Sequence, residues 1–141
     1  MQNKDHWEKV YTTKAADSVS WFQTHAELSM RLIRASGVGR HAAIIDVGGG
    51  ASTLVDDLLD DGYARLTVLD LSTAALEESR HRLGARSNAV TWAEADITRA
   101  TFMPHSIDLW HDRAVFHFLT DKADRDAYVR QVLRTLKPGG H

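Results

Sequence analysis

The chain has 141 residues, a formal net charge of −2 at pH 7 and no cysteine. This length suits a single domain of modest size, and the absence of thiols excludes disulfides and thiolate metal sites. The near-neutral charge gives no electrostatic footprint for nucleic acid, and no apolar run approaches the length that crosses a membrane. We therefore expect one cytoplasmic domain that binds neither nucleic acid nor a membrane.

The first forty residues contain a polar segment with aromatic side chains, followed by a helix. Trp7, Tyr11 and Trp21 lie in the polar segment. Such aromatic clusters belong to core packing more often than to a cofactor site, so both roles stay open. The apolar face of the following helix is predicted to consist of Leu28, Leu32 and Ile33. We separate this N-terminal helical segment, residues 1–40, from the main domain, residues 41–141.

A short apolar run at residues 44–47 predicts a buried parallel strand that contains Asp46. It leads directly into a glycine cluster, Gly48, Gly49 and Gly50. Glycines permit a sharp turn and a close approach to a ligand, and the next helix offers free N–H groups at its N-terminus. A dinucleotide fingerprint would need a further glycine at position 53, where Thr53 stands. The loop therefore predicts a nucleotide-type ligand that carries positive charge, because Asp46 would repel a pyrophosphate.

The next elements alternate between helix and strand. Apolar residues interleave with aspartates over residues 54–61, which predicts an amphipathic helix. Residues 66–70 predict a second strand, with Asp70 at its carboxyl end. An acid about twenty residues beyond a glycine loop is where a nucleotide ribose is held. Asp70 can equally be a helix N-terminal acid that helps Ser72 to cap the next helix, and both roles stay open.

Two further strands and two helices are predicted in the second half. Residues 73–83 predict a helix, and residues 90–97 predict a strand that ends at Asp96 and Ile97. Residues 107–111 predict the fourth strand. The core-facing stripe of the last helix is predicted to be Val129, Val132, Leu133 and Leu136. The Pro and Gly residues that follow are typical of a helix stop.

The glycine loop, Asp70 and Asp96 resemble, in order and spacing, the class I S-adenosylmethionine-dependent methyltransferases. The loop resembles motif I of this family, D/E-x-G-x-G-x-G, with Ser52 in place of the last glycine. The resemblance implies an α/β fold with a Rossmann-like, doubly wound parallel sheet. It also implies S-adenosyl-L-methionine as cofactor and S-adenosyl-L-homocysteine as product.

The resemblance also assigns cofactor contacts. The implied cofactor-binding residues are Asp46, Gly48, Gly49, Gly50, Asp70, Leu71, Asp96, Ile97, His111 and Trp21. Asp70 would hold the ribose, and Asp96 with Ile97 would clamp the adenine. Many small-molecule members of the family begin with a similar aromatic segment that folds over the cofactor. The resemblance thus implies that residues 1–40 form a cap or lid.

The resemblance covers nearly the whole chain but little more than half of the family's fold. A complete domain of the family has seven strands, whereas the sequence predicts four. We therefore expect residues 41–141 to form a partial cofactor-binding domain, truncated after the fourth strand and its following helix. The remaining strands would lie beside the fourth, so we expect an exposed edge and self-association through it.

The resemblance implies methyl transfer from S-adenosylmethionine, which we expect to reach a small-molecule acceptor rather than a protein. Because the leaving group is neutral, the protein must mainly align the reactants and exclude water. A general base is needed only for an acceptor that carries a proton. Residues 112–119 resemble the family's motif IV and the segment after it, which face the transferring methyl group. The catalytic candidates are Asp112, His111 and His117.

Other assignments for these side chains stay open. Arg113 could bind an acceptor carboxylate or form a local ion pair. No spacing such as H-E-x-x-H is present, so we expect no metal. A Rossmann-type, NAD-binding oxidoreductase fragment is one alternative function, which the absent third glycine disfavours. A non-catalytic remnant that binds the cofactor but transfers nothing is the other, and truncation leaves the activity of this chain open.

Overall fold

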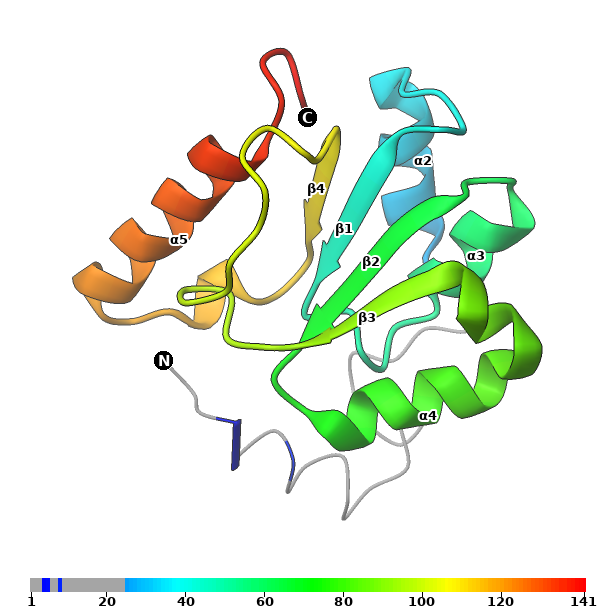
Figure 1. The fold of residues 1–141 in the computed structure, drawn as a ribbon, viewed down its shortest axis with the longest axis horizontal. Helices are drawn as coiled ribbons and strands as arrows, with labels where there is room; N and C mark the ends of the chain where they lie inside the picture. Colours follow the sequence, from blue (N-terminus) through cyan, green and yellow to red (C-terminus); the bar gives the residue numbers. More distant parts are fainter. Residues whose placement is uncertain (1–3, 6–7, 9–24) are drawn as a thin grey trace.

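Residues 4–5, 8 and 25–141 are described by the computed structural model, and they form a parallel sheet with helices on both faces (Figure 1). Most of the predicted N-terminal segment, including Trp7, Tyr11 and Trp21, lies outside the described residues. Its role as a lid, and the domain boundary after residue 40, therefore stay predictions. No helix in the described part of the chain is both long and apolar enough to cross a membrane. A cytoplasmic location likewise stays a prediction.

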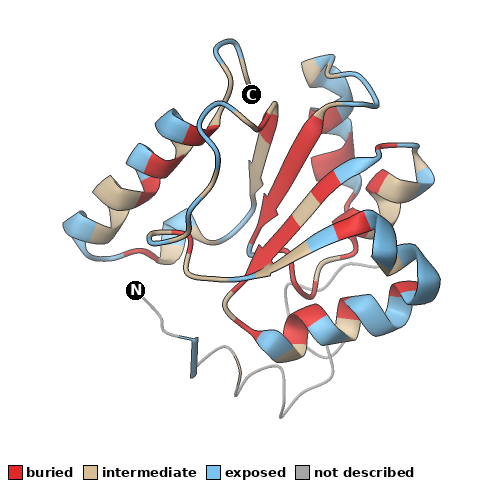
Figure 2. Ribbon diagram, in the orientation of Figure 1, coloured by how far each residue is buried: buried red, intermediate tan, exposed pale blue. Residues whose placement is uncertain are grey.

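The sheet has the order β3-β2-β1-β4, with every neighbouring pair parallel. Its strands are β1 (Ala43–Val47), β2 (Arg65–Asp70), β3 (Val90–Glu94) and β4 (Leu109–Asp112). Every residue of β1 is buried, which Figure 2 shows as a continuous red strand. A central strand covered on both faces must be apolar along its length, as the run around Asp46 is. From β1 the chain proceeds outward on one side to β2 and β3, and then returns to place β4 on the other side of β1. The predicted doubly wound α/β fold is confirmed.

From residue 25 onward, four helices cover the two faces of the sheet unequally (Figure 1). They are α2 (Glu27–Ser36), α3 (Leu54–Asp60), α4 (Thr73–Leu83) and α5 (Lys122–Thr135), with short 3-10 turns η2 (Gly84–Ala89) and η3 (Phe116–Phe118). Ile44 points into the core beneath α2, α3 and α4, whereas Ile45 points into the core beneath α5. The alternation of side chains along β1 thus divides the interior into two cores.

The two outer strands are shorter or shifted relative to the sequence prediction. The strand predicted at 90–97 ends at Glu94, because the Asp96 carboxylate accepts the N–H of Thr98 and turns the chain. The strand predicted at 107–111 runs from Leu109 to Asp112 instead. Ile107 forms only an isolated parallel bridge with Leu136.

The outer side of β4 is partly paired by the residues that follow α5. The His141 N–H donates to the Asp108 carbonyl at 2.9 Å, and the Trp110 N–H donates to the His141 carbonyl at 2.7 Å. In the sheet of named strands, β4 lies at the edge, as predicted. Self-association through this edge stays a prediction, which sedimentation at increasing protein concentration would test.

The predicted core-facing stripes of two helices are only partly right. Ile33 of α2 is buried, and Val132 and Leu136 at the end of α5 pack against the second core, but the other members are exposed. In α2, Leu28 and Leu32 are exposed, at 60% and 64% of their surface, while Ser29, Met30 and Ile33 are buried. In α5 the side chains of Val129 and Leu133 are exposed, and the buried side chains are Tyr128, Gln131 and Thr135. Each helix is rotated about its axis from the predicted orientation, so that it buries polar side chains beside apolar ones. Of the polar ones, Ser29 lines the cavity described next, and Gln131 supports a turn at its edge.

Candidate active site

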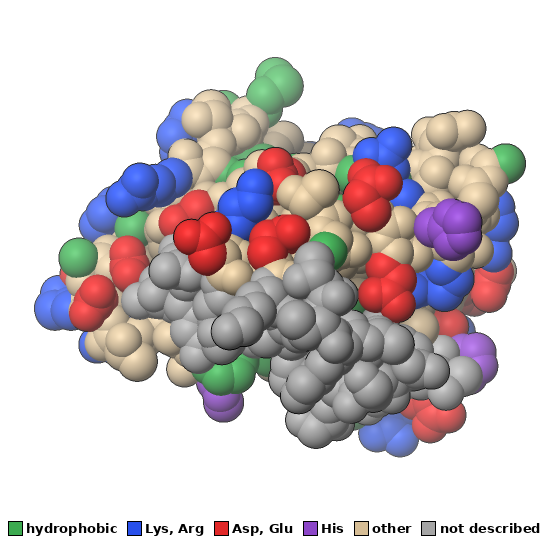
Figure 3. All heavy atoms as spheres, turned by 90° about the horizontal axis from the view of Figure 1, so that it is seen from below, with side chains coloured by type: hydrophobic (Ala, Val, Ile, Leu, Met, Phe, Trp, Pro, Cys, Tyr) green, Lys and Arg blue, Asp and Glu red, His purple; other side chains and the backbone are tan. Residues whose placement is uncertain are grey.

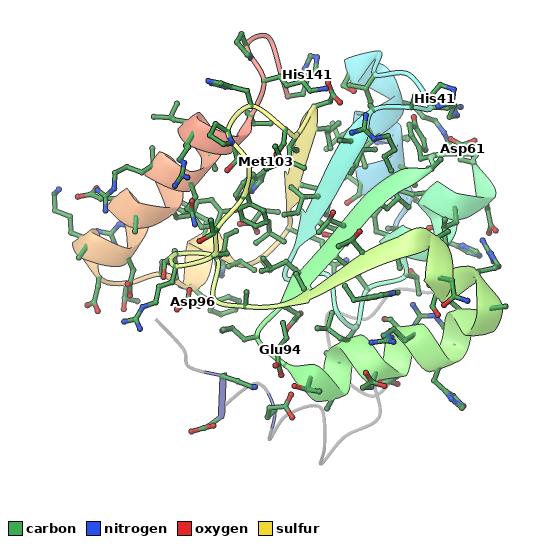
Figure 4. All side chains as sticks on the ribbon, viewed as in Figure 1. His41, Asp61, Glu94, Asp96, Met103 and His141 are labelled. Carbon is green, nitrogen blue, oxygen red and sulfur yellow. The ribbon has the colours of Figure 1, made fainter. Side chains whose placement is uncertain are left out.

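A cavity of about 1070 Å³, including its open mouth, lies at the carboxyl ends of the strands. In open α/β sheets a ligand binds where the strand order reverses, which here is between β1 and β4. The cavity is lined by most of the predicted cofactor-binding residues: Asp46, Gly48, Gly49, Asp70, Leu71, Asp96, Ile97 and His111. It also contains a residue that the sequence analysis missed, Ser29 of α2. Figure 4 shows Asp96 at this edge and His41 and Asp61 at the opposite one.

The glycine loop brings the backbone of β1 against the floor of the cavity. Gly48 has a φ of 74°, a conformation that a residue with a side chain adopts only with strain, and its N–H donates to the Leu69 carbonyl. A Cβ on Gly49 would lie 2.1 Å from Oδ2 of Asp46. The glycine at position 49 is therefore required by the carboxylate beside it.

Asp70 closes the loop from the end of β2. Its Oδ2 accepts the N–H of Gly50 at 3.0 Å, and its Oδ1 accepts the N–H of Ser72 at 2.9 Å. Burial raises the pKa of the Asp70 carboxyl to about 6. The two amide donors act in the opposite direction and lower this pKa, but burial has the larger effect. Ser72 itself caps α4 by accepting the N–H of Ala75. Asp70 thus supports the start of α4, and its remaining lone pairs can accept two hydroxyl groups.

The turn after β3 is held from both sides. Asp96 Oδ1 accepts the backbone N–H and the hydroxyl of Thr98 at 2.9 and 2.7 Å. From α5, the buried Gln131 amide donates to the carbonyls of Ile97 and Ala100. Gln131 was not predicted as a site residue, and it fixes the position of the Asp96–Ile97 turn without lining the cavity.

A hydrogen-bonded chain of three side chains lies at the β1/β4 end of the cavity. His111 Nδ1 lies 2.8 Å from Asp46 Oδ1, and His111 Nε2 lies 2.8 Å from the Ser29 hydroxyl. Asp46 and His111 are register partners on adjacent strands, so the sheet itself brings them together. The second carboxylate oxygen, Asp46 Oδ2, is buried and has no hydrogen-bond partner in the described part of the protein.

The other two catalytic candidates lie outside the cavity lining. Asp112 accepts the N–H groups of Val115 and Phe116, at 2.7 and 3.0 Å, and the hydroxyl of Tyr128. Burial and this bond to Asp112 raise the pKa of Tyr128 well above its usual range. Asp112 therefore organises the loop that follows β4. His117 is exposed, with its ring edge against Phe118.

Arg113, from the same loop, is exposed and lines the cavity. The carboxylates of the lining outnumber its permanent cations: three aspartates, Asp46, Asp70 and Asp96, lie against Arg113. Figure 3 views the molecule from this end, and Asp and Glu side chains recur across the middle of the coloured surface. The site favours a ligand of net positive charge. Within the described ranges, no three His, Asp or Glu side chains gather where they could hold a metal ion.

The described residues near the N-terminus lie at the same end of the sheet. Glu8 accepts the hydroxyl of Ser72 and the N–H of Ala74, both at 2.8 Å. Lys4 forms an exposed ion pair with Glu94 at 2.7 Å. The start of the chain is thus joined to the turn that carries Asp70.

Comparison with known proteins assigns the family. The family model described as "Methyltransferase domain" matches residues 44–140. The chain belongs to this family. The resemblance to class I S-adenosylmethionine-dependent methyltransferases, inferred from the loop and the two acids, is confirmed.

Individual relatives are distant in sequence. The eEF1A lysine and N-terminal methyltransferase of Bos taurus is 25% identical over 142 residues, which are 96% of this chain and 20% of the relative. The chain thus spans about a fifth of the length of this curated relative.

Two solved structures share the fold. The N-methyltransferase NodS from Bradyrhizobium japonicum, solved with S-adenosylhomocysteine, superimposes with a TM-score of 0.77 at 21% identity, over 99% of this chain and 70% of NodS. A structure described as "Conversion of a Disulfide Bond into a Thioacetal Group during Echinomycin Biosynthesis" superimposes with a TM-score of 0.76 at 23% identity, over 96% of this chain and 56% of the other.

Proposed function

We propose that this chain binds S-adenosylmethionine and takes part in methyl transfer to a small-molecule acceptor. The single observation that carries the proposal is Asp46 Oδ2, a buried carboxylate oxygen without a partner in the described residues, placed against the glycine loop. A buried carboxylate oxygen is costly unless it accepts a hydrogen bond. The ammonium group in the methionine part of the cofactor would supply that donor, and a pyrophosphate would not.

The remaining parts of the cofactor have matching residues along the same edge. Asp70 and Leu71, at the end of β2, would take the ribose hydroxyls. Asp96 and Ile97, after β3, would take the adenine. With the adenosine on β2 and β3, the sulfonium end falls over β1 and β4, beside His111. His111, with Ser29 bonded to its Nε2, would then lie next to the reacting atoms.

The cofactor supplies an electrophilic methyl group on a good leaving group, so the protein's task is placement. The apolar lining, which includes Val47, Leu69, Val115 and Leu119, excludes water from the reacting atoms. Asp112 holds the loop after β4 in place through three hydrogen bonds. These residues bind and orient, which is what an in-line displacement demands.

A protein acceptor is the second candidate. It is supported by the lysine and N-terminal methyltransferase, with which the match extends over 96% of this chain. A protein acceptor would present an amine at the cavity mouth, next to the exposed Arg113. Methyl transfer to peptides with free lysine and free N-termini would distinguish it from transfer to small amines, thiols and oxyanions.

Calorimetric titration with S-adenosylmethionine, S-adenosylhomocysteine and NAD tests the proposal. We expect both sulfur compounds to bind and NAD to bind more weakly than either. The matched control is Asp61→Ala, which removes a carboxylate at the opposite edge of the sheet (Figure 4) and should not change affinity. Tighter binding of NAD by folded protein would refute the assignment. Cofactor binding without transfer to any acceptor would favour the non-catalytic remnant.

A further inference from the structure

The geometry points to a proton-accepting chain, Ser29–His111–Asp46, that receives the proton of an amine acceptor during methyl transfer. This inference rests on the proposed function and deepens it, because it names the acceptor class and the groups that act on it. None of the three residues is adjacent to another in sequence: Asp46 and His111 are 65 residues apart, and Ser29 and His111 are 82 apart.

The direction of the two hydrogen bonds follows from what each group can donate. An ionised carboxylate only accepts, so His111 Nδ1 carries the hydrogen that Asp46 Oδ1 receives at 2.8 Å. In the neutral ring Nε2 then has the free lone pair, and the Ser29 hydroxyl donates to it at 2.8 Å. The groups thus follow one another in the order carboxylate, Nδ1, Nε2 and hydroxyl. Serine-histidine-acid triads, which transfer a proton from the hydroxyl to the imidazole, have the same order.

Burial makes the chain effective. The side chains of Asp46 and His111 are 4% and 15% exposed, so little water competes for their bonds. When His111 gains a proton, the adjacent carboxylate stabilises the imidazolium in a low-dielectric site. Asp46 is thus a positioning residue, and His111 is the base.

The position of the chain relative to the cofactor follows from the strand order. Adenosine contacts at β2 and β3 leave the sulfonium over β1 and β4, where both His111 and Ser29 line the cavity. Before the attack, a proton of the acceptor's ammonium group passes to the Ser29 oxygen, while the Ser29 hydroxyl proton passes to His111 Nε2. The freed lone pair of the acceptor nitrogen then forms a bond to the methyl carbon, and the carbon–sulfur bond breaks with its electron pair on sulfur.

An amine is the acceptor class that fits best. The titratable and charged groups that line the cavity around His111 are Asp46, Asp70, Asp96 and Arg113, so acids predominate. They attract an ammonium ion and repel a carboxylate or a phosphate. An ammonium ion must also lose a proton before its nitrogen can attack, so its methylation requires a base. A thiolate or a carboxylate acceptor carries no such proton and requires none.

Nitrogen-15 NMR of the histidine rings tests the chain without any turnover. With S-adenosylhomocysteine bound at neutral pH, we expect His111 in the Nδ1–H tautomer. Asp46→Asn, which replaces the charged acceptor of the Nδ1–H, should shift the His111 Nδ1 resonance. Methylammonium chloride should shift the His111 Nε2 resonance in the wild type but not in Ser29→Ala, and sodium acetate should not shift it. An Nε2–H tautomer, or a response to acetate alone, would overturn the proposal.

Turnover provides the second test, with methylamine and Nα-acetyl-lysine amide as amine probes and 2-mercaptoethanol as the thiol. His111→Gln and Ser29→Ala should each lower amine methylation about 100-fold and restore most of it at pH 10, where the free amine needs no base. Ser29→Ala should keep its affinity for S-adenosylhomocysteine. His81→Gln, an exposed histidine of α4, is the matched control.

The two tests separate this inference from the proposed function. Failure of the wild type to bind S-adenosylhomocysteine would refute the proposed function. Normal binding with full amine turnover in Ser29→Ala and His111→Gln would refute only the proton-accepting chain. Methylation of the thiol but not the amines would refute the acceptor class. If no probe is methylated, the NMR comparison decides.

Discussion

The two ends of the cavity are built in different ways. At the β2/β3 end, the key carboxylates bond to backbone amides two residues further along the chain: Asp70 to Ser72 and Asp96 to Thr98. At the β1/β4 end, Asp46, His111 and Ser29 come from three elements that are far apart in sequence. The first end is built on two local turns, which Gly50 and Gln131 support from elsewhere in the chain, whereas the second exists only through tertiary packing. Binding of adenosine and handling of the acceptor should therefore respond to different mutations.

The largest expected effect concerns the local end. Asp70→Ala would remove the acceptor of both ribose hydroxyls, and the affinity for S-adenosylhomocysteine should fall by about 2–4 kcal/mol. Asp70→Asn should be intermediate. Calorimetry measures the affinity, and NMR should find the His111 tautomer unchanged. Normal binding by a folded Ala variant would mean that Asp70 only supports the start of α4.

The pH dependence of stability sharpens the same contrast. The carboxyl pKa of Asp70 is about 6 in the folded protein, against an ordinary value of 3.8, so between these pH values the folded state binds more protons. Stability due to Asp70 should therefore fall as the pH rises from about 4 to about 6, by about 3 kcal/mol, and stay level above that. Urea unfolding of the wild type and Asp70→Asn across this range isolates the effect. A difference that does not change with pH would contradict it.

Gly49→Ala should disturb the β1/β4 end directly. The added Cβ would lie 2.1 Å from Asp46 Oδ2, and Asp46 is held by His111, so the carboxylate or the loop must move. We expect a loss of about 1–3 kcal/mol in the free energy of unfolding, as for other overpacked interiors. The His111 resonances should shift as well. Gly39→Ala is the matched control, because a Cβ there meets nothing within 4 Å.

Gln131→Leu should have the smallest effect. Gln131 does not line the cavity and influences the cofactor only by holding the Asp96–Ile97 turn. Two carbonyls, of Ile97 and Ala100, would lose their donor, and the affinity for S-adenosylhomocysteine should weaken by about 1 kcal/mol. Leu133→Gln, two residues away on the exposed face of α5, is the control and should change neither affinity nor stability measurably. A strong destabilisation by Leu133→Gln would restore the stripe that the sequence predicted.

What could be predicted from the sequence follows the same division. The glycine loop, Asp70, Asp96 and the limits of α4 could all be recognised because each depends on residues close in sequence. Asp46 and His111 were predicted as cofactor contacts, but their bond to each other depends on the register of β1 and β4, which no local pattern encodes. That register could have been guessed only from the strand order.

Ser29 and Gln131 were missed for a common reason. A hydrophobic stripe assumes that the inner face of a helix is wholly apolar. In α2, however, Ser29 is buried beside Met30 and Ile33, and in α5 Gln131 is buried beside Tyr128. The stripes chosen by hydropathy placed Leu32 and Leu133 in the core, where the structure leaves both exposed. Partners on other elements, His111 for Ser29 and the turn at Ile97 for Gln131, compensate for burying these polar groups.

The place of β4 at the edge of the named strands has a consequence for local unfolding. Elements with fewer neighbours open at lower free energy than the centre of a sheet, so β4 should exchange its amide hydrogens before β1 and β2 do. Opening of β4 would carry His111 away from Asp46 while Asp70, at the end of the inner strand β2, stays in place. Mild denaturant should thus produce a species that keeps Asp70 in position but has lost its proton acceptor, and hydrogen exchange read residue by residue would reveal it.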